Sequence, residues 1–349
     1  MGEPNAGHAA VADFLICRAA HAALSANFDD LIEHWAESKK VYMRGALSGQ
    51  DAVAFTETAP LLKFHGCLRT REQTLWTQNQ LHQPETKKRV ESCTEWMKLN
   101  LPGKDLLVIG FWTDWGYLND VLANAMKARS FNSVTVVDPL TDADLEAKAP
   151  VLWEALSNSG APFQHVQGSG ADALEELRVG FSKVWARKFF ELGRPLFEKT
   201  GGVYSAAAVE TRITIATNAL YDFRRDVEGL PYCRAARKKE PAAEAAQAAL
   251  MGLLLIDHGA TTNGSWYVHG GRNIRVVHGG GQGLSTVQDR YKEPPAIPQA
   301  DIVVCAGAVD LGVPARVIAP GFGASAVRPA PGVGSRWLTL EQARSELGV

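Results

Sequence analysis

The segment Asp105-Leu-Leu-Val-Ile-Gly110 has the pattern of a buried β-strand that ends in a glycine. Short continuous apolar runs followed by a turn residue are typical of strands covered on both faces. A second strand of this kind, Ser133-Val-Thr-Val-Val-Asp138, ends in a carboxylate. The residues from Tyr117 to Ala128 between them have helical spacing. This order predicts a parallel α/β sheet, in which ligands bind at the carboxyl ends of the strands.

The same alternation extends to both sides of this segment. The further elements expected are a helix from Ala6 to Arg18, a strand ending near Asn27, a helix with Leu31 and Trp35, a strand over Leu61–His65, a helix within 142–158, a strand over Phe163–Gln167, and a helix from Ala171. We therefore expect a doubly wound, Rossmann-like parallel sheet over residues 1–180.

The character of the chain changes after residue 180. Helical segments are expected at Phe181–Glu198 and Ala206–Glu228, and the chain is rich in glycine and proline from Gly259 onward. Short apolar runs recur there, as in Ile302-Val-Val304. A length of 349 residues suits two domains. Residues 181–349 are therefore expected to form an additional α+β region, whose role the sequence leaves open.

The composition restricts the functional class. A hydrophobic content of 46% with 21% charged residues is ordinary for a globular protein, and the net charge of −2 gives no electrostatic reason to expect nucleic acid or membrane as a partner. Basic runs such as Lys87-Lys88-Arg89 are expected on solvated faces. The five cysteines form no Cys-x-x-Cys pair, so we expect neither zinc nor disulfides. With no signal-peptide pattern at the N-terminus, a cytoplasmic location is expected.

Compact polar groups follow two of the expected strands. One motif contains Asn27-Phe-Asp29 and the other ends in His65-Gly66. An amide, a carboxylate and an imidazole at one sheet edge could bind a ribose and move a proton without a metal. Structural roles are the alternative: His65 could bond a backbone carbonyl, and Asn27 and Asp29 could form an Asx turn or helix cap.

These motifs belong to a longer series of motifs along the chain. Pro4-Asn5-x-x-His8, Asn27-x-Asp29, His65-Gly66 and two strands ending in Gly110 and Asp138 follow one another. The series resembles the sirtuins, and more specifically the bacterial sirtuin-like NAD hydrolases. The resemblance covers roughly residues 4–180.

The resemblance implies a catalytic role for three residues. His65 would be the general base acting on the hydroxyls of the nicotinamide ribose or on water. Asn27 would orient the ribose or the attacking water, and Asp29 would brace the loop. Breaking the nicotinamide–ribose bond builds positive charge on the sugar while a cationic group leaves, so one base in a dry pocket can suffice.

The resemblance also implies an NAD-binding set. Gly110 would allow close backbone approach to the dinucleotide, with Thr113 in the turn that follows. Asp138 would accept a hydrogen bond from the adenosine ribose, and Gly168 and Ala171 would lie near the adenine. The alternative for Asp138 is a simple strand-ending turn.

The chain departs from the family pattern in several ways. No Gly-Ala-Gly loop precedes Pro4, so the sirtuin-like domain is expected to be N-terminally incomplete. Trp112 stands where a small hydroxyl residue is usual. The zinc-ribbon cysteines of the deacylases are missing, which favours the NAD hydrolases. Ile274–Gly283 and Ile302–Pro314 each combine a strand with glycines and could replace the lost loop, although turns in a small β-containing appendage are the simpler expectation.

Two classes of function follow. The first is an enzyme that binds NAD as its substrate and hydrolyses it in bacterial antiphage defence, as a homo-oligomer or with a defence partner protein. The second is a degenerate, non-catalytic sirtuin-like module for partner binding or assembly. An NAD-dependent protein deacylase is a weaker third.

Overall fold

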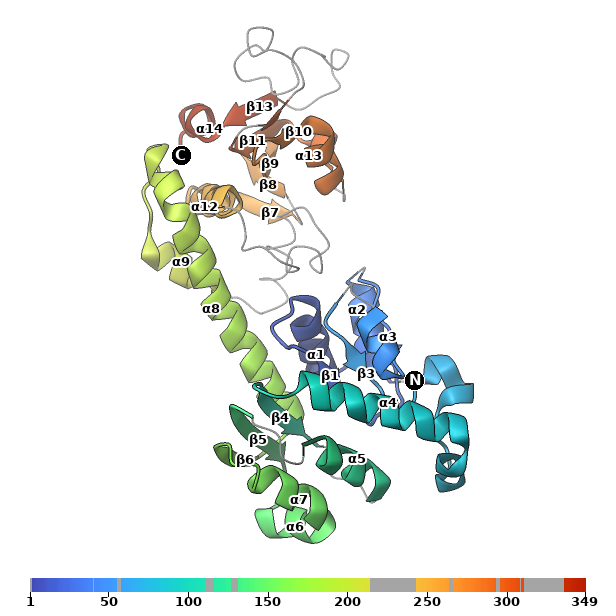
Figure 1. Cartoon of the computed structure of the whole chain (residues 1–349). Coiled ribbons are helices and arrows are strands. Elements are labelled where there is room, and N and C mark those ends of the chain that lie inside the picture. Colours follow the sequence, from blue (N-terminus) through green and yellow to red (C-terminus); the bar gives the residue numbers. More distant parts are fainter. Residues whose placement is uncertain are drawn as a thin grey trace. The chain divides into compact units, whose positions relative to one another are not determined.

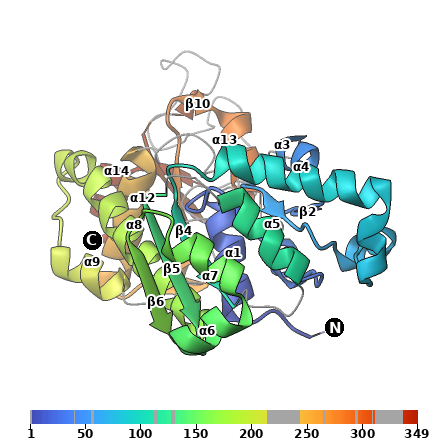
Figure 2. The same ribbon diagram turned by 60° about the horizontal axis from the view of Figure 1, so that its bottom comes forward.

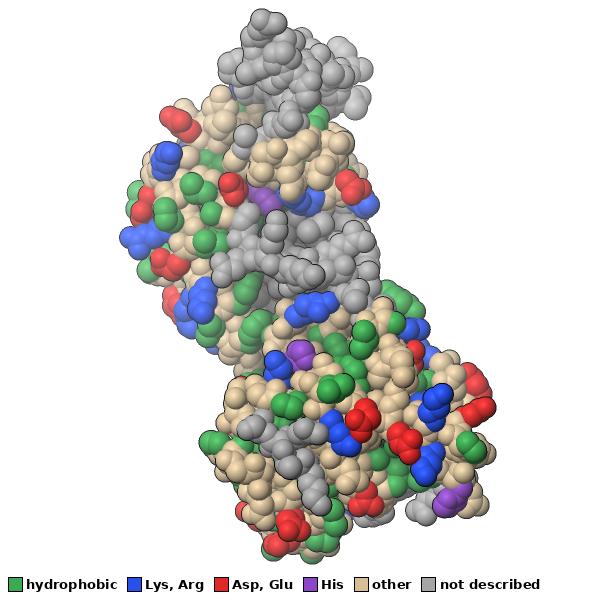
Figure 3. All heavy atoms as spheres, viewed as in Figure 1, with side chains coloured by type: hydrophobic (Ala, Val, Ile, Leu, Met, Phe, Trp, Pro, Cys, Tyr) green, Lys and Arg blue, Asp and Glu red, His purple; other side chains and the backbone are tan. Residues whose placement is uncertain are grey.

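The computed structural model describes residues 2–39, 41–54, 58–110, 116–126, 131–213, 243–263, 266–292, 296–307, 309–310 and 336–349. The chain divides into two compact units, Met1–Arg178 (unit 1) and Val179–Val349 (unit 2), and the division falls within the long helix α8 (Gly170–Lys199) (Figure 1). None of the helices in these ranges has the length and apolar character needed to cross a membrane. The face of each unit seen in Figure 3 mixes basic and acidic side chains.

Unit 1 begins with a small parallel sheet. Its strands lie in the order β1-β3-β2, with Ala23 paired to Leu61 and Gly45 paired to the same residue from the other side. Each of these strands spans only two residues. The elements of this part are α1 (Ala6–Ile16), β1 (Ala23–Leu24), α2 (Leu31–Ser38), β2 (Gly45–Ala46), α3 (Gly49–Ala54), β3 (Leu61–Leu62), and the 3-10 helices η1 (Leu68–Gln73) and η2 (Gln78–His82).

A second parallel sheet completes unit 1. Its strands run side by side in the order β4-β5-β6, as Figure 2 shows. The helix expected within 142–158 is two helices, because Pro150 has no N–H to continue the first one. The elements are α4 (Pro84–Asn100), β4 (Asp105–Ile109), α5 (Gly116–Met126), β5 (Ser133–Asp138), α6 (Asp142–Lys148), α7 (Pro150–Ser157), β6 (Phe163–Gln167) and the start of α8.

Both sheets of unit 1 share one hydrophobic core. Leu62 and Phe64 at the end of the first sheet belong to the same buried cluster as Val108 and Val136 of the second. Leu122 of α5 also packs into this cluster. Parallel strands with helices against them confirm the expected Rossmann-like α/β class.

Unit 2 contains a mixed sheet in the order β13-β11-β9-β8-β7. The first three strands are parallel, and β8 and β7 are antiparallel to their neighbours. The additional C-terminal region is therefore a mixed-sheet unit. Its elements are α9 (Ala206–Ile213), α12 (Ala243–Asp257), β7 (Thr261–Asn263), β8 (Trp266–His269), β9 (Arg272–His278), β10 (Gln282–Gly283), α13 (Leu284–Arg290), η3 (Ile297–Gln299), β11 (Ile302–Ala306), β12 (Val309–Asp310), β13 (Arg336–Thr339) and α14 (Leu340–Leu347).

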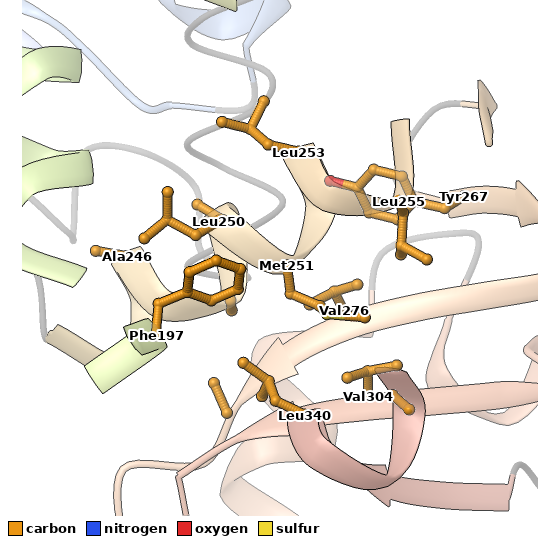
Figure 4. Close-up of a cluster of buried hydrophobic side chains, with 14 of the residues drawn as sticks. Phe197, Ala246, Leu250, Met251, Leu253, Leu255, Tyr267, Val276, Val304 and Leu340 are labelled. Carbon is orange, nitrogen blue, oxygen red and sulfur yellow. The ribbon is translucent and has the colours of Figure 1, made fainter. Parts of the chain in front are cut away.

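The alanine-rich helix α12 lies at the centre of the main core of unit 2. In Figure 4, Phe197 of α8 lies beside Ala246 and Leu250 of α12, and Val276 and Val304 come from β9 and β11. Gly193 of α8 is held so close to α12 that a Cβ there would lie 2.5 Å from the backbone of Ala246. Small residues on both helices therefore permit this close packing.

The hypothesis that a C-terminal strand completes the sheet of the N-terminal region is wrong for β9 and β11. Each is an internal strand of unit 2: β9 lies between β8 and β11, and β11 lies between β9 and β13. Both edges of each strand already carry backbone hydrogen bonds, so neither can complete another sheet. The apolar run at 316–319 lies outside the described residues.

Candidate functional site

The glycine of His65-Gly66 is required by a tight turn after β3. Gly66 has φ +119°, and a Cβ there would lie 2.7 Å from Oγ1 of Thr74 and still closer to its Cα. The turn aligns the backbone with a second segment, since the Leu75 N–H donates to the His65 carbonyl at 2.9 Å and the Cys67 N–H donates to Thr74 Oγ1 at 3.1 Å. Only glycine fits this approach.

The buried His65 ring has a defined hydrogen bond. Its Nε2 lies 2.8 Å from the carbonyl oxygen of Leu75, and the residue is 8% exposed. Because a carbonyl only accepts, Nε2 carries the proton in the neutral ring and the lone pair lies on Nδ1. If His65 acts as a base, Nδ1 is therefore the atom that receives the proton.

The Asn27–Asp29 segment lies directly beside this histidine. The ring of Phe28 meets His65 edge-on, with the centroids 6.3 Å apart, and the Leu68 N–H donates to the Phe28 carbonyl at 2.7 Å. The two polar motifs are thus brought together. Asn27 is exposed, and its side chain bonds no other residue in the described ranges. The Asp29 carboxylate accepts the N–H of Leu31 at 3.2 Å, as in the Asx-turn alternative.

A buried ion pair holds the segment in place. The Lys63 Nζ lies 3.0 Å from Glu33 Oε1, with side chains 1% and 0% exposed, and it also donates to the backbone carbonyl of Asp29. Cys67 lies next to the pair, and burial, the largest effect, raises the pKa of its thiol. Sequence reasoning missed this pair, although a lysine within the apolar run Leu61–Phe64 was a visible signal.

A second group of candidate residues lies at the carboxyl edge of β4, β5 and β6. Gly110, with φ +54°, donates its N–H to the Val137 carbonyl at 3.2 Å, and the Gly168 N–H donates to the Asp138 carbonyl at 3.1 Å. The register pairs Ile109 with Val137 and Asp138 with Gln167. The structure therefore brings Gly110, Asp138 and Gly168 together.

The side chain of Asp138 is buried, and one of its oxygens is in use. Oδ1 accepts the N–H of Leu140 at 3.0 Å, which is the turn geometry of the structural alternative. Its Oδ2 accepts no hydrogen bond from the residues that the structure describes. Ala171 lies in the first turn of α8, where the preceding Gly170 is packed against Ile109. The remaining candidate, Thr113, lies outside the described residues.

Tyr117 contacts the buried histidine of the first group. It belongs to the first turn of α5, which follows β4 and Gly110 in the chain, and its ring meets His65 edge-on at 6.1 Å. Burial, opposed by the charge of Arg89, raises the pKa of the Tyr117 hydroxyl. The phenol therefore remains protonated at neutral pH.

One comparison with known proteins identifies this part of the chain. Residues 21–158 match a family model described as SIR2-like domain. Unit 1 carries a sirtuin-like domain. The matched range includes Asn27, Asp29, His65, Gly110 and Asp138, and such domains are associated with NAD. No curated protein matches the chain.

The Pro4-Asn5-x-x-His8 motif caps a helix. It precedes the range that matches the sirtuin-like domain. The Asn5 side chain accepts the His8 N–H at 3.1 Å, and His8 Nδ1 accepts the Asn5 N–H at 3.2 Å. These reciprocal bonds form a capping box at the start of α1. The motif therefore has a structural explanation that needs no ligand.

Arg89 is a further residue near the site that sequence reasoning missed, because its basic run suggests a solvated face. Its Nη1 donates to the carbonyl of Gln73, just before the Thr74–Leu75 segment that faces His65. The Nε and Nη2 atoms are buried and bond no atom of the described residues. Burial lowers the pKa of Arg89. A partly desolvated positive charge thus lies near Tyr117.

Proposed function

We propose that the sirtuin-like domain binds NAD and hydrolyses its nicotinamide–ribose bond, giving nicotinamide and ADP-ribose. The observation that carries the proposal is the position of His65. Its ring is buried, its tautomer leaves Nδ1 as the acceptor, and it lies beside the Asn27–Asp29 segment.

The reaction needs little more than one base and a positioned water. As the bond to C1′ breaks, the electron pair leaves with nicotinamide and positive charge develops on the ribose. Water adds to C1′ and loses a proton, which His65 Nδ1 accepts directly or through a ribose hydroxyl. The exposed amide of Asn27 is available to orient that water or the ribose. Asp29 contributes by bracing the loop through Leu31 and Lys63.

The second group of residues supports binding of the dinucleotide. Backbone at Gly110 and Gly168 lies at the carboxyl edge of a parallel sheet, where such ligands bind. The Oδ2 of Asp138 can accept a hydrogen bond from a ribose hydroxyl. Thr113 and Ala171 complete the proposed binding set.

By the same resemblance, the activity serves bacterial antiphage defence, either in a homo-oligomer or with a defence partner protein. An enzyme that depletes a cell of NAD requires such regulation. This context depends on the NAD-hydrolase branch of the family, which the absence of paired cysteines in the sequence favours.

A non-catalytic module is the second candidate. The bond from His65 Nε2 to the Leu75 carbonyl favours it, because this is how a structural histidine is satisfied. Such a module would bind a partner without turning NAD over.

Incubation of the full chain with NAD, followed by chromatography, distinguishes the two. The enzyme releases nicotinamide, and His65→Ala and Asn27→Ala abolish the release. His258→Ala, which changes an exposed histidine of unit 2, leaves it intact and is the matched control. If wild-type protein releases no nicotinamide, the hydrolase proposal fails and the module remains.

A further inference from the structure

Two glycine loops lie side by side at the carboxyl ends of β9 and β11 in unit 2. The first follows His278 and contains Gly279–Gly281, and the second begins at Gly307. The Gly279 N–H donates to the Ala306 carbonyl at 2.8 Å, and β10 pairs with β12 just beyond. The carboxyl ends of neighbouring parallel strands are the place where α/β sheets bind ligands.

The first loop contains two glycines with positive φ. Gly280 and Gly281 have φ of +57° and +69°, and no atom lies within 4 Å of the position of a Cβ on either. Glycine is therefore required at both positions by the backbone conformation and not by a close neighbour. The N–H groups of both donate to no acceptor in the described part of the chain.

His278 contributes a buried imidazole ring beside this loop. The residue is 8% exposed, and Arg290 Nη1 lies 3.3 Å from each ring nitrogen. Burial, followed by the charge of Arg290, lowers the pKa of His278 to about 3, so the ring is neutral at pH 7. A neutral imidazole has one accepting and one N–H nitrogen, and a guanidinium only donates. Arg290 can therefore satisfy one ring nitrogen, and the other N–H meets no acceptor among the described residues.

Arg290 adds a positive charge to this place. Its Nη1 donates to the His278 carbonyl at 3.1 Å and its Nη2 donates to the Gln282 side chain. Within the described ranges no carboxylate pairs with it, whereas its neighbour Lys292 pairs with Asp289 at 2.8 Å. A half-buried guanidinium beside an unpaired imidazole N–H attracts an anion with several acceptor oxygens.

We propose that unit 2 carries a ligand site of its own at the carboxyl ends of β9 and β11, for a phosphate group held by Arg290, His278 and the Gly280–Gly281 amides. Phosphate fits because it offers several acceptor oxygens to such donors, and arginine recognises it through a planar fork. Glu244 of α12 lies beside the second loop, since a Cβ on Gly307 would be 3.0 Å from its Cγ. An acidic side chain there accepts hydrogen bonds from sugar hydroxyls, which favours a nucleotide over free phosphate.

Isothermal titration of the full chain with ADP and, separately, with inorganic phosphate tests the site. ADP is expected to bind, and Arg290→Gln weakens that binding at least tenfold. Lys292→Gln, a matched loss of a nearby positive charge, changes the Kd less than twofold. Tight binding of ADP with weak binding of phosphate identifies a nucleotide site, and equal binding of both identifies a phosphate site.

A second variant distinguishes loss of the site from misfolding. Gly281→Asp places a negative charge in the open loop, at a φ that aspartate tolerates, and is expected to weaken ADP binding while the melting temperature is retained. Unchanged ADP binding in both Arg290→Gln and Gly281→Asp overturns the proposal, as does ADP binding lost only in Asp138→Asn of unit 1. Nicotinamide release is a separate readout, so failure of either proposal leaves the other intact.

Discussion

Replacing Lys63 by methionine should strongly destabilise unit 1. The substitution leaves the Glu33 carboxylate buried, at 0% side-chain exposure, without the ammonium group 3.0 Å away. It also removes the donor to the Asp29 carbonyl. Breaking a buried pair from one side costs about 3–5 kcal/mol, because the remaining charge is neither solvated nor paired. This is a large share of the total stability of roughly 5–15 kcal/mol expected for a domain.

Urea unfolding followed by tryptophan fluorescence measures the effect. With a slope of about 2 kcal/mol per molar urea, the loss corresponds to a fall of ~1.5–2.5 M in the midpoint of unit 1. The double variant Glu33→Gln/Lys63→Met should recover about 2 kcal/mol or more, since it leaves no buried charge. Lys98→Met, which breaks the exposed pair with Glu95, should cost less than about 1 kcal/mol. A Lys63→Met protein within about 1 kcal/mol of wild type would show that Glu33 does not depend on this ion pair.

Three further predictions concern individual turns and ionisable groups. Gly66→Ala forces a Cβ against Thr74 at a φ of +119°, so it should cost about 3 kcal/mol or more in the same urea assay and abolish nicotinamide release; a stable, active variant would contradict the turn geometry. His278, whose pKa falls from 6.5 to about 3 on folding, makes unit 2 lose stability as the pH drops below 6.5 towards 3. At pH 5 the free energy of unfolding should be lower by about 2 kcal/mol. The urea midpoint should therefore fall less between pH 7 and pH 5 in His278→Gln than in wild type. Asn5→Ala removes one half of the capping box and should lower stability by about 1 kcal/mol, whereas Asn5→Ser should be nearly neutral.

The sequence predicted the second sheet of unit 1 well. The strands expected at 105–110, 133–138 and 163–167 match β4, β5 and β6 to within one residue. Their apolar runs are long enough to leave little ambiguity. By contrast, β2 at Gly45–Ala46 was missed, because two small residues carry no strand pattern and the pairing arises from tertiary packing.

The sheet of unit 2 was only partly visible in the sequence. A tight hairpin joins β8 and β9 through Gly270-Gly271, both with positive φ, which is the turn that a glycine pair predicts. The apolar runs at Ile274 and Ile302 were noted as short segments of an appendage. Their pairing as parallel neighbours, which places His278 opposite Ala306, depends on contacts distant in sequence.

At the candidate site, the sequence predicted that the Asn27–Asp29 and His65-Gly66 segments lie close together. It did not predict the contacts that hold them in place. Parallel pairing of the strands before Asn27 and His65 brings both segments to one edge. The Glu33–Lys63 pair and the contact of Tyr117 with His65 depend on how α2 and α5 pack. No local pattern encodes such packing, so only the structure reveals these residues.

Product stoichiometry tests whether the protein hydrolyses NAD with His65 as the base. Purified full chain incubated with NAD should yield nicotinamide and ADP-ribose in equal amounts, and His65→Ala should yield neither while still unfolding cooperatively in urea. Equal product formation by wild type and a folded His65→Ala protein would show that His65 is not the base.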